Sequence, residues 1–176
     1  MSRNVKTNVE FRRDVLDVFV HGATLYCYQC NVCTTECPVA NTVGPDKYNP
    51  RRNILLAMSG LDYMIFGADA DNFNVWGCTV CDTCDEKCPQ KIELTAVFQL
   101  LKQVSVARGE APSAILGQAK TVLEHGKAIP LMAAIERRRK AMNLPEPPRV
   151  AVEEVKTLLE AAGLPEVIAK AEKKEA

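Results

Sequence analysis

Two stretches of the chain, CYQCNVCTTECP at residues 27–38 and CTVCDTCDEKCP at residues 78–89, decide its fold. Both follow the pattern C-x2-C-x2-C-x3-C-P, and together they contain all eight cysteines of the 176-residue chain. Every cysteine of the first run recurs 51 positions later in the second. The two runs are therefore copies of one site, and the chain contains an internal repeat.

The spacing of the cysteines predicts two [4Fe–4S] clusters. In ferredoxins with two clusters, the first three cysteines of such a run bind one cluster and the fourth binds the other cluster. The predicted ligands of cluster A are Cys27, Cys30, Cys33 and Cys88. The predicted ligands of cluster B are Cys78, Cys81, Cys84 and Cys37. This exchange of fourth ligands ties the two halves of the repeat together.

Two zinc sites are the main alternative to iron–sulfur clusters. Zinc also takes four thiolates, but its ligands usually come as two separated C-x2-C pairs. Two runs of four cysteines, each followed by proline, favour iron–sulfur. A disulfide framework is disfavoured, because the polar N-terminus does not resemble a secretory signal and thiols stay reduced in the cytoplasm, the expected location.

Composition excludes several classes of function. Lys plus Arg and Asp plus Glu number 22 each, so the formal net charge is zero. That balance argues against binding to nucleic acid or to an anionic membrane surface. No run of 18 apolar residues is present, so no transmembrane segment is expected. The chain also lacks a G-x-G-x-x-G dinucleotide motif.

The sequence predicts an all-α fold, because no useful alternating strand pattern occurs and apolar residues recur with helical spacing. Asn49 is expected to cap a helix that begins at Pro50 and buries Ile54, Leu55 and Met58. Ser113 is expected to cap a later helix. The predicted helices cover residues 9–25, 50–58, 93–108, 113–126, 130–142 and 152–162.

Three segments are expected along the chain. Residues 1–110 form the domain that holds both clusters, and residues 111–142 form a helical extension. Residues 143–176 contain a proline-rich linker, a short helix and a charged tail. The apolar stripe of that short helix needs a surface to cover, either on its own domain or on a partner protein.

All eight cysteines are assigned to clusters, so no thiol remains as a nucleophile and no catalytic residue is predicted. Electron transfer is the default function of such a chain. Apolar neighbours of the clusters should shield them from water. The candidates for that shell are Tyr26, Val32, Val39, Trp76, Val80 and Ile92.

The 40 residues between Cys37 and Cys78 contain a predicted helix, which resembles the α-helical ferredoxins related to the iron–sulfur protein of succinate dehydrogenase. Within that superfamily, CYQCNVCT at residues 27–34 and WGCTVCDTC at residues 76–84 resemble the HdrC-like iron–sulfur proteins of heterodisulfide reductase. The resemblance covers about residues 10–110. It implies an α-helical two-cluster ferredoxin with a C-terminal helical extension.

The resemblance also implies a place within a larger oxidoreductase. HdrC-like proteins relay single electrons from a flavoprotein subunit (HdrA-like) to a catalytic subunit (HdrB-like) that reduces the CoM-S-S-CoB heterodisulfide in methanogenesis. Hydrogenase or formate dehydrogenase modules are further expected partners. The Cys-Cys-Gly motif of HdrB-like proteins is absent. Two related functions remain open, namely a sulfur-oxidising Hdr-like complex and a glycolate, lactate or glycerol-phosphate dehydrogenase.

Overall fold

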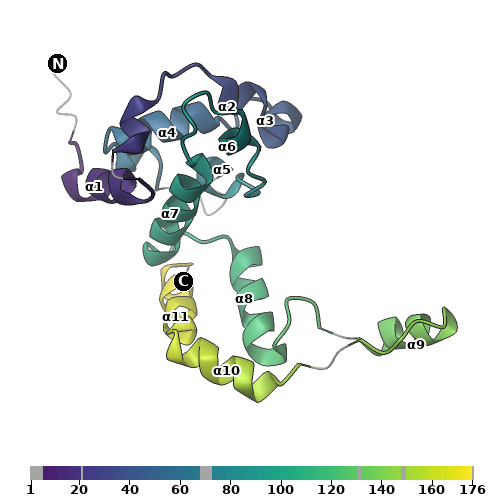
Figure 1. Ribbon diagram of the computed structural model, residues 1–176. Helices are drawn as coiled ribbons and strands as arrows, with labels where there is room; N and C mark the ends of the chain where they lie inside the picture. Colours follow the sequence, from purple (N-terminus) through teal and green to yellow (C-terminus); the bar gives the residue numbers. More distant parts are fainter. Residues whose placement is uncertain (1–5, 21, 68–72, 131, 148–149, 176) are drawn as a thin grey trace. The chain divides into compact units, whose positions relative to one another are not determined.

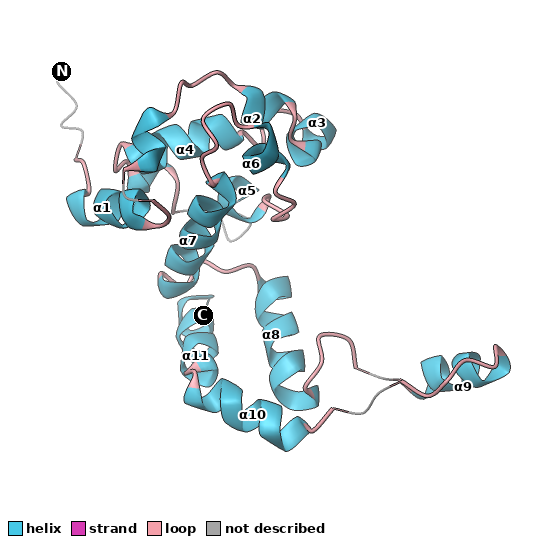
Figure 2. Cartoon of the chain, in the orientation of Figure 1, coloured by secondary structure: helices cyan, strands magenta, loops and turns pink. Residues whose placement is uncertain are grey.

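The computed structural model is helical, and it describes residues 6–20, 22–67, 73–130, 132–147 and 150–175. Figure 2 shows helices joined by loops, with no strand in these ranges. The prediction of an all-α fold is therefore confirmed. The chain divides into two compact units, Met1–Glu110 and Ala111–Ala176.

Unit 1 contains both cysteine runs and is built from short helices (Figure 1). In chain order its described elements are α1 (Val9–Asp17), η1 (Ala23–Tyr26), α2 (Val32–Thr35), α3 (Pro38–Val43), α4 (Pro50–Met58), η2 (Asp62–Met64), α5 (Phe73–Trp76), α6 (Thr83–Lys87) and α7 (Leu94–Ala107). Helices α2 and α6 each start inside a cysteine run. These two helices contact each other, α2 also contacts α4, and α6 also contacts α7.

The internal repeat extends from the cysteines to the helices that follow them. The Oγ1 atom of Thr34 accepts a hydrogen bond from the Arg51 N–H in the first turn of α4, at 3.0 Å. The Oδ1 atom of Asp85 accepts one from the Thr95 N–H in the first turn of α7, also at 3.0 Å. Each bond satisfies a backbone donor that a helix leaves unpaired at its N-terminus. Helices α4 and α7 are therefore equivalent elements of the two halves.

The core of unit 1 lies beneath the cysteine runs and joins the two halves. The partly buried side chains of Cys27, Cys33, Cys78, Cys84 and Cys88 pack against it. Burial of apolar side chains of this kind is the main stabilising contribution to folding. The core is formed by Phe11, Val15, Ile54, Leu56, Ala57, Ile65, Phe66, Val75, Ile92, Leu94, Val97, Phe98 and Leu101.

Several helix predictions are confirmed, and others are corrected. The side chain of Asn49 caps α4, accepting from the Arg52 N–H at 2.9 Å, and Pro50 occupies the first turn. Leu55, predicted to be buried, is 40% exposed, whereas the neighbouring Leu56 and Ala57 lie in the core. The helix predicted over residues 9–25 ends at Asp17. The sequence also predicts a polar loop over residues 67–74, but residues 73 and 74 begin α5, and residues 68–72 lie outside the described residues.

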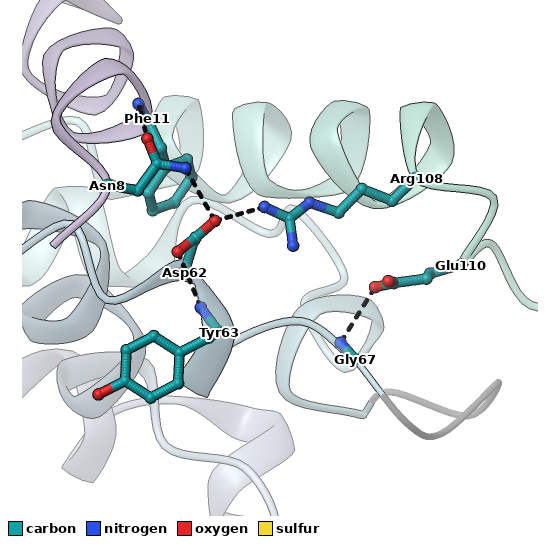
Figure 3. A network of polar contacts seen from close by, with 7 residues as sticks. All are labelled: Asn8, Phe11, Asp62, Tyr63, Gly67, Arg108 and Glu110. Carbon is teal, nitrogen blue, oxygen red and sulfur yellow. Dashed lines mark hydrogen bonds and ion pairs between the residues drawn. The ribbon is translucent and has the colours of Figure 1, made fainter. Parts of the chain in front are cut away.

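A polar network joins the beginning, middle and end of unit 1 (Figure 3). The carboxylate of Asp62 accepts hydrogen bonds from Asn8 Nδ2, at 2.9 Å, and from the guanidinium of Arg108. Burial opposes the charge of Asp62, but the bonds from Asn8 and Arg108 outweigh it and lower the pKa of the carboxyl group. The network therefore stabilises the fold at neutral pH, and that contribution is lost as the pH falls through the lowered pKa.

Unit 2 contains the described helices α8 (Ser113–His125), α9 (Ala133–Ala141), α10 (Val152–Ala161) and α11 (Leu164–Glu175). Pro112, and not Ser113 as predicted, is the residue at the N-cap of α8. The last residues were expected to be a charged tail, but they form α11, which buries Ile168 and Ala171. Helix α10 contacts α8 and α11, but none of its residues is buried and Leu158 of its apolar stripe is 65% exposed.

Candidate metal centre

The first three cysteines of the first run and the last cysteine of the second line one cavity, called cavity A. Its cysteines are Cys27, Cys30, Cys33 and Cys88, and its empty volume is about 400 Å³. Arg51 and Ile54 from α4 and Ile92 and Leu94 from the start of α7 complete the wall. The structure therefore brings together the four residues assigned to cluster A.

A second cavity, called cavity B, is lined by the remaining four cysteines. These are Cys78, Cys81, Cys84 and Cys37, around an empty volume of about 330 Å³. Further wall residues are Tyr48 and Pro50, together with Thr95 and Phe98 of α7. Each cavity thus takes three cysteines from one run and the fourth from the other, and its four cysteines are those assigned to one cluster.

The backbone of the two cysteine loops has the same unusual conformation. Gln29 and Asn31, on either side of Cys30, have positive φ angles of 55° and 70°. Val80 and Asp82, on either side of Cys81, have φ angles of 55° and 58°. Alternation of right- and left-handed residues turns successive N–H groups inward and creates a concavity that favours an anion, as at many iron–sulfur sites. Val80 is the most strained of the four, because its side chain is branched at Cβ.

Several of the cysteine sulfur atoms accept hydrogen bonds from nearby N–H groups. The N–H groups of Val80 and Ile92 donate to Cys78 Sγ and Cys88 Sγ, each at 3.4 Å. The side-chain amide of Gln29 donates to Cys27 Sγ at 3.3 Å. Donors of this kind stabilise thiolates and tune the reduction potential of a bound cluster.

Burial opposes the ionisation of two of the thiols. It raises the pKa of Cys33 to about 11, with a further contribution from the charge of Cys27. Burial, followed by the charge of Asp85, raises the pKa of Cys84 to about 12. At the exposed Cys81, hydrogen bonding from Thr83 lowers the pKa instead. Iron binds thiolates, so loading of either cavity must release protons from its buried thiols.

Two buried polar atoms on residues that line cavity A have no hydrogen-bond partner among the described residues. They are the Nε–H donor of Arg51 and the Oε1 acceptor of Gln29. A buried donor without an acceptor is costly. The sulfur atoms of an anionic cluster would supply that acceptor, so the donor set of cavity A fits a [4Fe–4S] cluster. All eight cysteines are free thiols, and in the described ranges no three His, Cys, Asp or Glu side chains gather closely enough to hold a single metal ion.

The predicted apolar shell is only partly confirmed. Val32 and Ile92 line cavity A and Val39 lines cavity B. Tyr26, by contrast, is 70% exposed, and the indole of Trp76 donates to Ser105 Oγ at 3.0 Å within the protein. Neither Trp76 nor Val80 is among the lining residues of the two cavities.

Apart from Ile92, the wall residues contributed by α4, α7 and the loops before them were missed, because the repeat changes its spacing after the cysteines. The loop before α7 is shorter than the loop before α4, so wall positions recur after 44 residues and not after 51. A search at the shorter spacing would have found these equivalent positions. They are Tyr48 and Ile92, Pro50 and Leu94, Arg51 and Thr95, and Ile54 and Phe98.

Comparison with known proteins agrees with this geometry. A family model described as a 4Fe-4S dicluster domain matches residues 23–92, which include both cysteine runs. Fold, cavities and family model together define the class: the chain carries a dicluster iron–sulfur domain. None of the helices in the described ranges has the length and hydropathy needed to cross a membrane.

Relatives extend the match beyond that domain. An HdrC-type iron–sulfur protein of CoB–CoM heterodisulfide reductase from Methanocaldococcus jannaschii is 30% identical over 149 residues, covering 81% of this chain and 76% of the relative. The HdrC-type component of the H(2):CoB-CoM heterodisulfide,ferredoxin reductase of Methanothermobacter thermautotrophicus is 32% identical, and the match covers 81% of this chain and 77% of the relative. The HdrC-type component of the Ferredoxin/F(420)H(2)-dependent CoB-CoM heterodisulfide reductase of Methanosarcina acetivorans is 32% identical, and the match covers 83% of this chain and 89% of the relative. The chain belongs to the HdrC family of heterodisulfide reductase iron–sulfur proteins.

Proposed function

We propose that this chain binds two [4Fe–4S] clusters and relays single electrons inside a heterodisulfide reductase complex. Cluster A is held by Cys27, Cys30, Cys33 and Cys88, and cluster B by Cys78, Cys81, Cys84 and Cys37. The observation that carries this proposal is the crossed lining of the two cavities, in which each run supplies three thiols to one cavity and one to the other.

The electron donor in this proposal is a flavin-containing protein of the complex, and the acceptor is a component that reduces the CoM-S-S-CoB heterodisulfide. The names of the relatives support the complex and its substrate class. A relay role, and not a catalytic one, is supported by the cysteines, because all eight line the two cavities and none is left over as a nucleophile. Clusters with four thiolate ligands exchange electrons without binding a substrate.

The division of labour along the chain is part of the proposal. Every lining residue of cavities A and B belongs to unit 1, Met1–Glu110. Unit 2, residues 111–176, is then a helical extension that contributes no cluster ligand. A chain truncated after Glu110 should accordingly retain its full cluster content.

The test is anaerobic purification followed by measurement of iron and acid-labile sulfide. The proposal expects a brown protein with about eight iron and eight sulfide per chain, the content of two cubanes. Copurification from the native source should yield the flavoprotein and disulfide-reducing partners. Reduced clusters should then be reoxidised by the heterodisulfide only when the disulfide-reducing partner is present. A colourless protein that contains zinc would refute the cofactor assignment.

A further inference from the structure

The two cavities have the same backbone but different charges at equivalent positions. Position 34 is threonine, whereas its counterpart 85 is aspartate. Position 51 is arginine, whereas its counterpart 95 is threonine. Both pairs are linked by the same hydrogen bond, from the N–H of the residue at 51 or 95 to the side chain of the residue at 34 or 85. The two halves of the repeat thus share these hydrogen bonds but differ in the charge of the residues that make them.

Cavity A carries a positive charge in its wall. Arg51 is always protonated in proteins, and its buried Nε–H has no acceptor among the described residues. Thr34, the residue after Cys33, is neutral. None of the described residues that line this cavity has a carboxylate. An electron added to a group in cavity A therefore meets a guanidinium that no carboxylate in the wall offsets.

Cavity B has carboxylates close to its cysteines. Asp85 Oδ1 lies 3.4 Å from Cys84 Sγ, and Asp82 belongs to the cavity wall. Two cations lie near the same cavity: Lys102 donates to the carbonyl of Cys78 at 2.6 Å, and Lys91 lines a surface groove together with Asp82 and Asp85. A carboxylate therefore contacts a cysteine sulfur of cavity B, whereas the charged group in the wall of cavity A is the guanidinium of Arg51.

Hydroxyl groups act against this difference without reversing it. The buried Tyr48 lines cavity B together with Cys78, and Thr95 Oγ1 lies 3.9 Å from Cys84 Sγ. Such donors stabilise the reduced form of a cluster in cavity B. Interactions with full charges are about twice as strong as those between neutral groups, and they fall off slowly with distance in a partly buried site.

We infer that Arg51 and Asp85 set a potential difference between the two sites, so that the cluster in cavity A has the higher reduction potential and receives the first electron. The step is a one-electron reduction from [4Fe–4S]2+ to [4Fe–4S]+, in which no bond forms or breaks. Within the relay, the electron comes from the reduced flavin of the donor protein, and transfer from cavity B to cavity A is downhill. This inference rests on the proposed function and adds a direction to it.

The test is a redox titration of the full-length holoprotein, with dithionite as reductant, followed by electron paramagnetic resonance. Wild-type protein should show two midpoints. Arg51→Gln should lower the upper midpoint and leave the lower one in place. Asp85→Asn should raise the lower midpoint and leave the upper one, because asparagine keeps the oxygen that caps Thr95 but lacks the charge.

Matched controls are available beside each residue. Arg52→Gln and Glu86→Gln make the same charge changes at adjacent, exposed positions, where solvent screens them. The inference expects the shifts at positions 51 and 85 to be several times larger than those of the controls. Arg51→Lys, which keeps the charge, should keep most of the upper midpoint.

The outcomes separate this inference from the proposed function. A chain that binds no iron would refute the function itself. A chain with two clusters would refute only the potential difference if Arg51→Gln moved the lower midpoint, if Asp85→Asn moved the upper one, or if neither shift exceeded its control. Should one variant lose a cluster, the other variant still decides the question, since each reports on a different midpoint.

Discussion

The loops around Cys30 and Cys81 each have a left-handed residue on either side of that cysteine. The helices α4 and α7 that follow them each begin with an N–H group bonded to a side chain of the preceding cysteine segment, a contact called here the bridging hydrogen bond. Their surroundings nevertheless differ, with a guanidinium at one cavity and carboxylates and hydroxyls at the other. A duplicated site thus keeps the backbone that shapes it, while its wall residues are free to vary. Shape and electrostatics are therefore set by different residues, and substitutions can separate them.

The largest expected effect comes from Cys37 and Cys88, because each lines the cavity whose other three cysteines belong to the opposite run. Cys88→Ser should remove the cluster from cavity A and leave the cluster in cavity B, although Cys88 belongs to the second run. Anaerobic alkylation and mass spectrometry would check this, because Cys27, Cys30 and Cys33 should become reactive while the thiols of cavity B stay protected. Cys37→Ser is the matched variant and should give the reverse pattern. Exposure of Cys78, Cys81 and Cys84 in the Cys88→Ser protein would contradict the assignment.

The two bridging hydrogen bonds should differ in strength. Asp85→Ala should cost about 1–2 kcal/mol of stability, because the N-cap residue of α7 offers no side-chain bond and a carboxylate interacts favourably with a helix N-terminus. Thr34→Ala should cost less, about 0.5–1 kcal/mol, since Asn49 still caps α4. Anaerobic thermal unfolding measures both, with Asp85→Asn as the control that keeps the bond. Equal losses at positions 34 and 85 would argue against this difference.

A smaller effect is expected from the left-handed residues. A non-glycine residue in this conformation costs roughly 1–2 kcal/mol, so Val80→Gly should stabilise the fold by up to about 1 kcal/mol after loss of its packing and gain of unfolded-state entropy. Gln29→Gly should bring no gain, because it also removes the hydrogen bond to Cys27 Sγ. Thr79→Gly, a neighbour with ordinary φ, should destabilise. A lower melting temperature for Val80→Gly than for Thr79→Gly would show that the loop is not strained at Val80.

The smallest expected effect concerns the hydroxyl of Tyr48. This side chain is 1% exposed and lines cavity B together with Cys78. Burial raises the pKa of its hydroxyl well above the ordinary value, so the group stays protonated and can donate to a sulfur atom of a cluster. Tyr48→Phe should keep the ring contacts with Phe73 and Phe98 and lower only the lower midpoint. The shift should be smaller than that of Asp85→Asn in the same titration. A rise of either midpoint would contradict the role of the hydroxyl.

The sequence predicted the parts of the molecule that depend on local pattern. Cysteine spacing grouped the residues that line each cavity, and the Asn49-Pro50 pair located the start of α4. The charged walls were not predicted, because Arg51 and Thr95 become equivalent only through a change of loop length that hides the repeat. Helix α11 was missed for a different reason: its charged composition resembles a tail, and burial of Ile168 and Ala171 depends on the rest of unit 2.

The crossed lining of the cavities also bears on how the protein is made. A chain emerging from the ribosome presents seven of its eight cysteines once Cys84 is exposed, yet the wall of cavity A still lacks Cys88 and the residues up to Leu94. Cavity B has its four cysteines at that point, but Thr95 and Phe98 close it only later. Insertion of iron and sulfide into either site must therefore wait until the first turns of α7 have been synthesised. Maturation is therefore expected to follow the synthesis of this helix, and a message truncated before α7 should yield a chain that loads neither cavity.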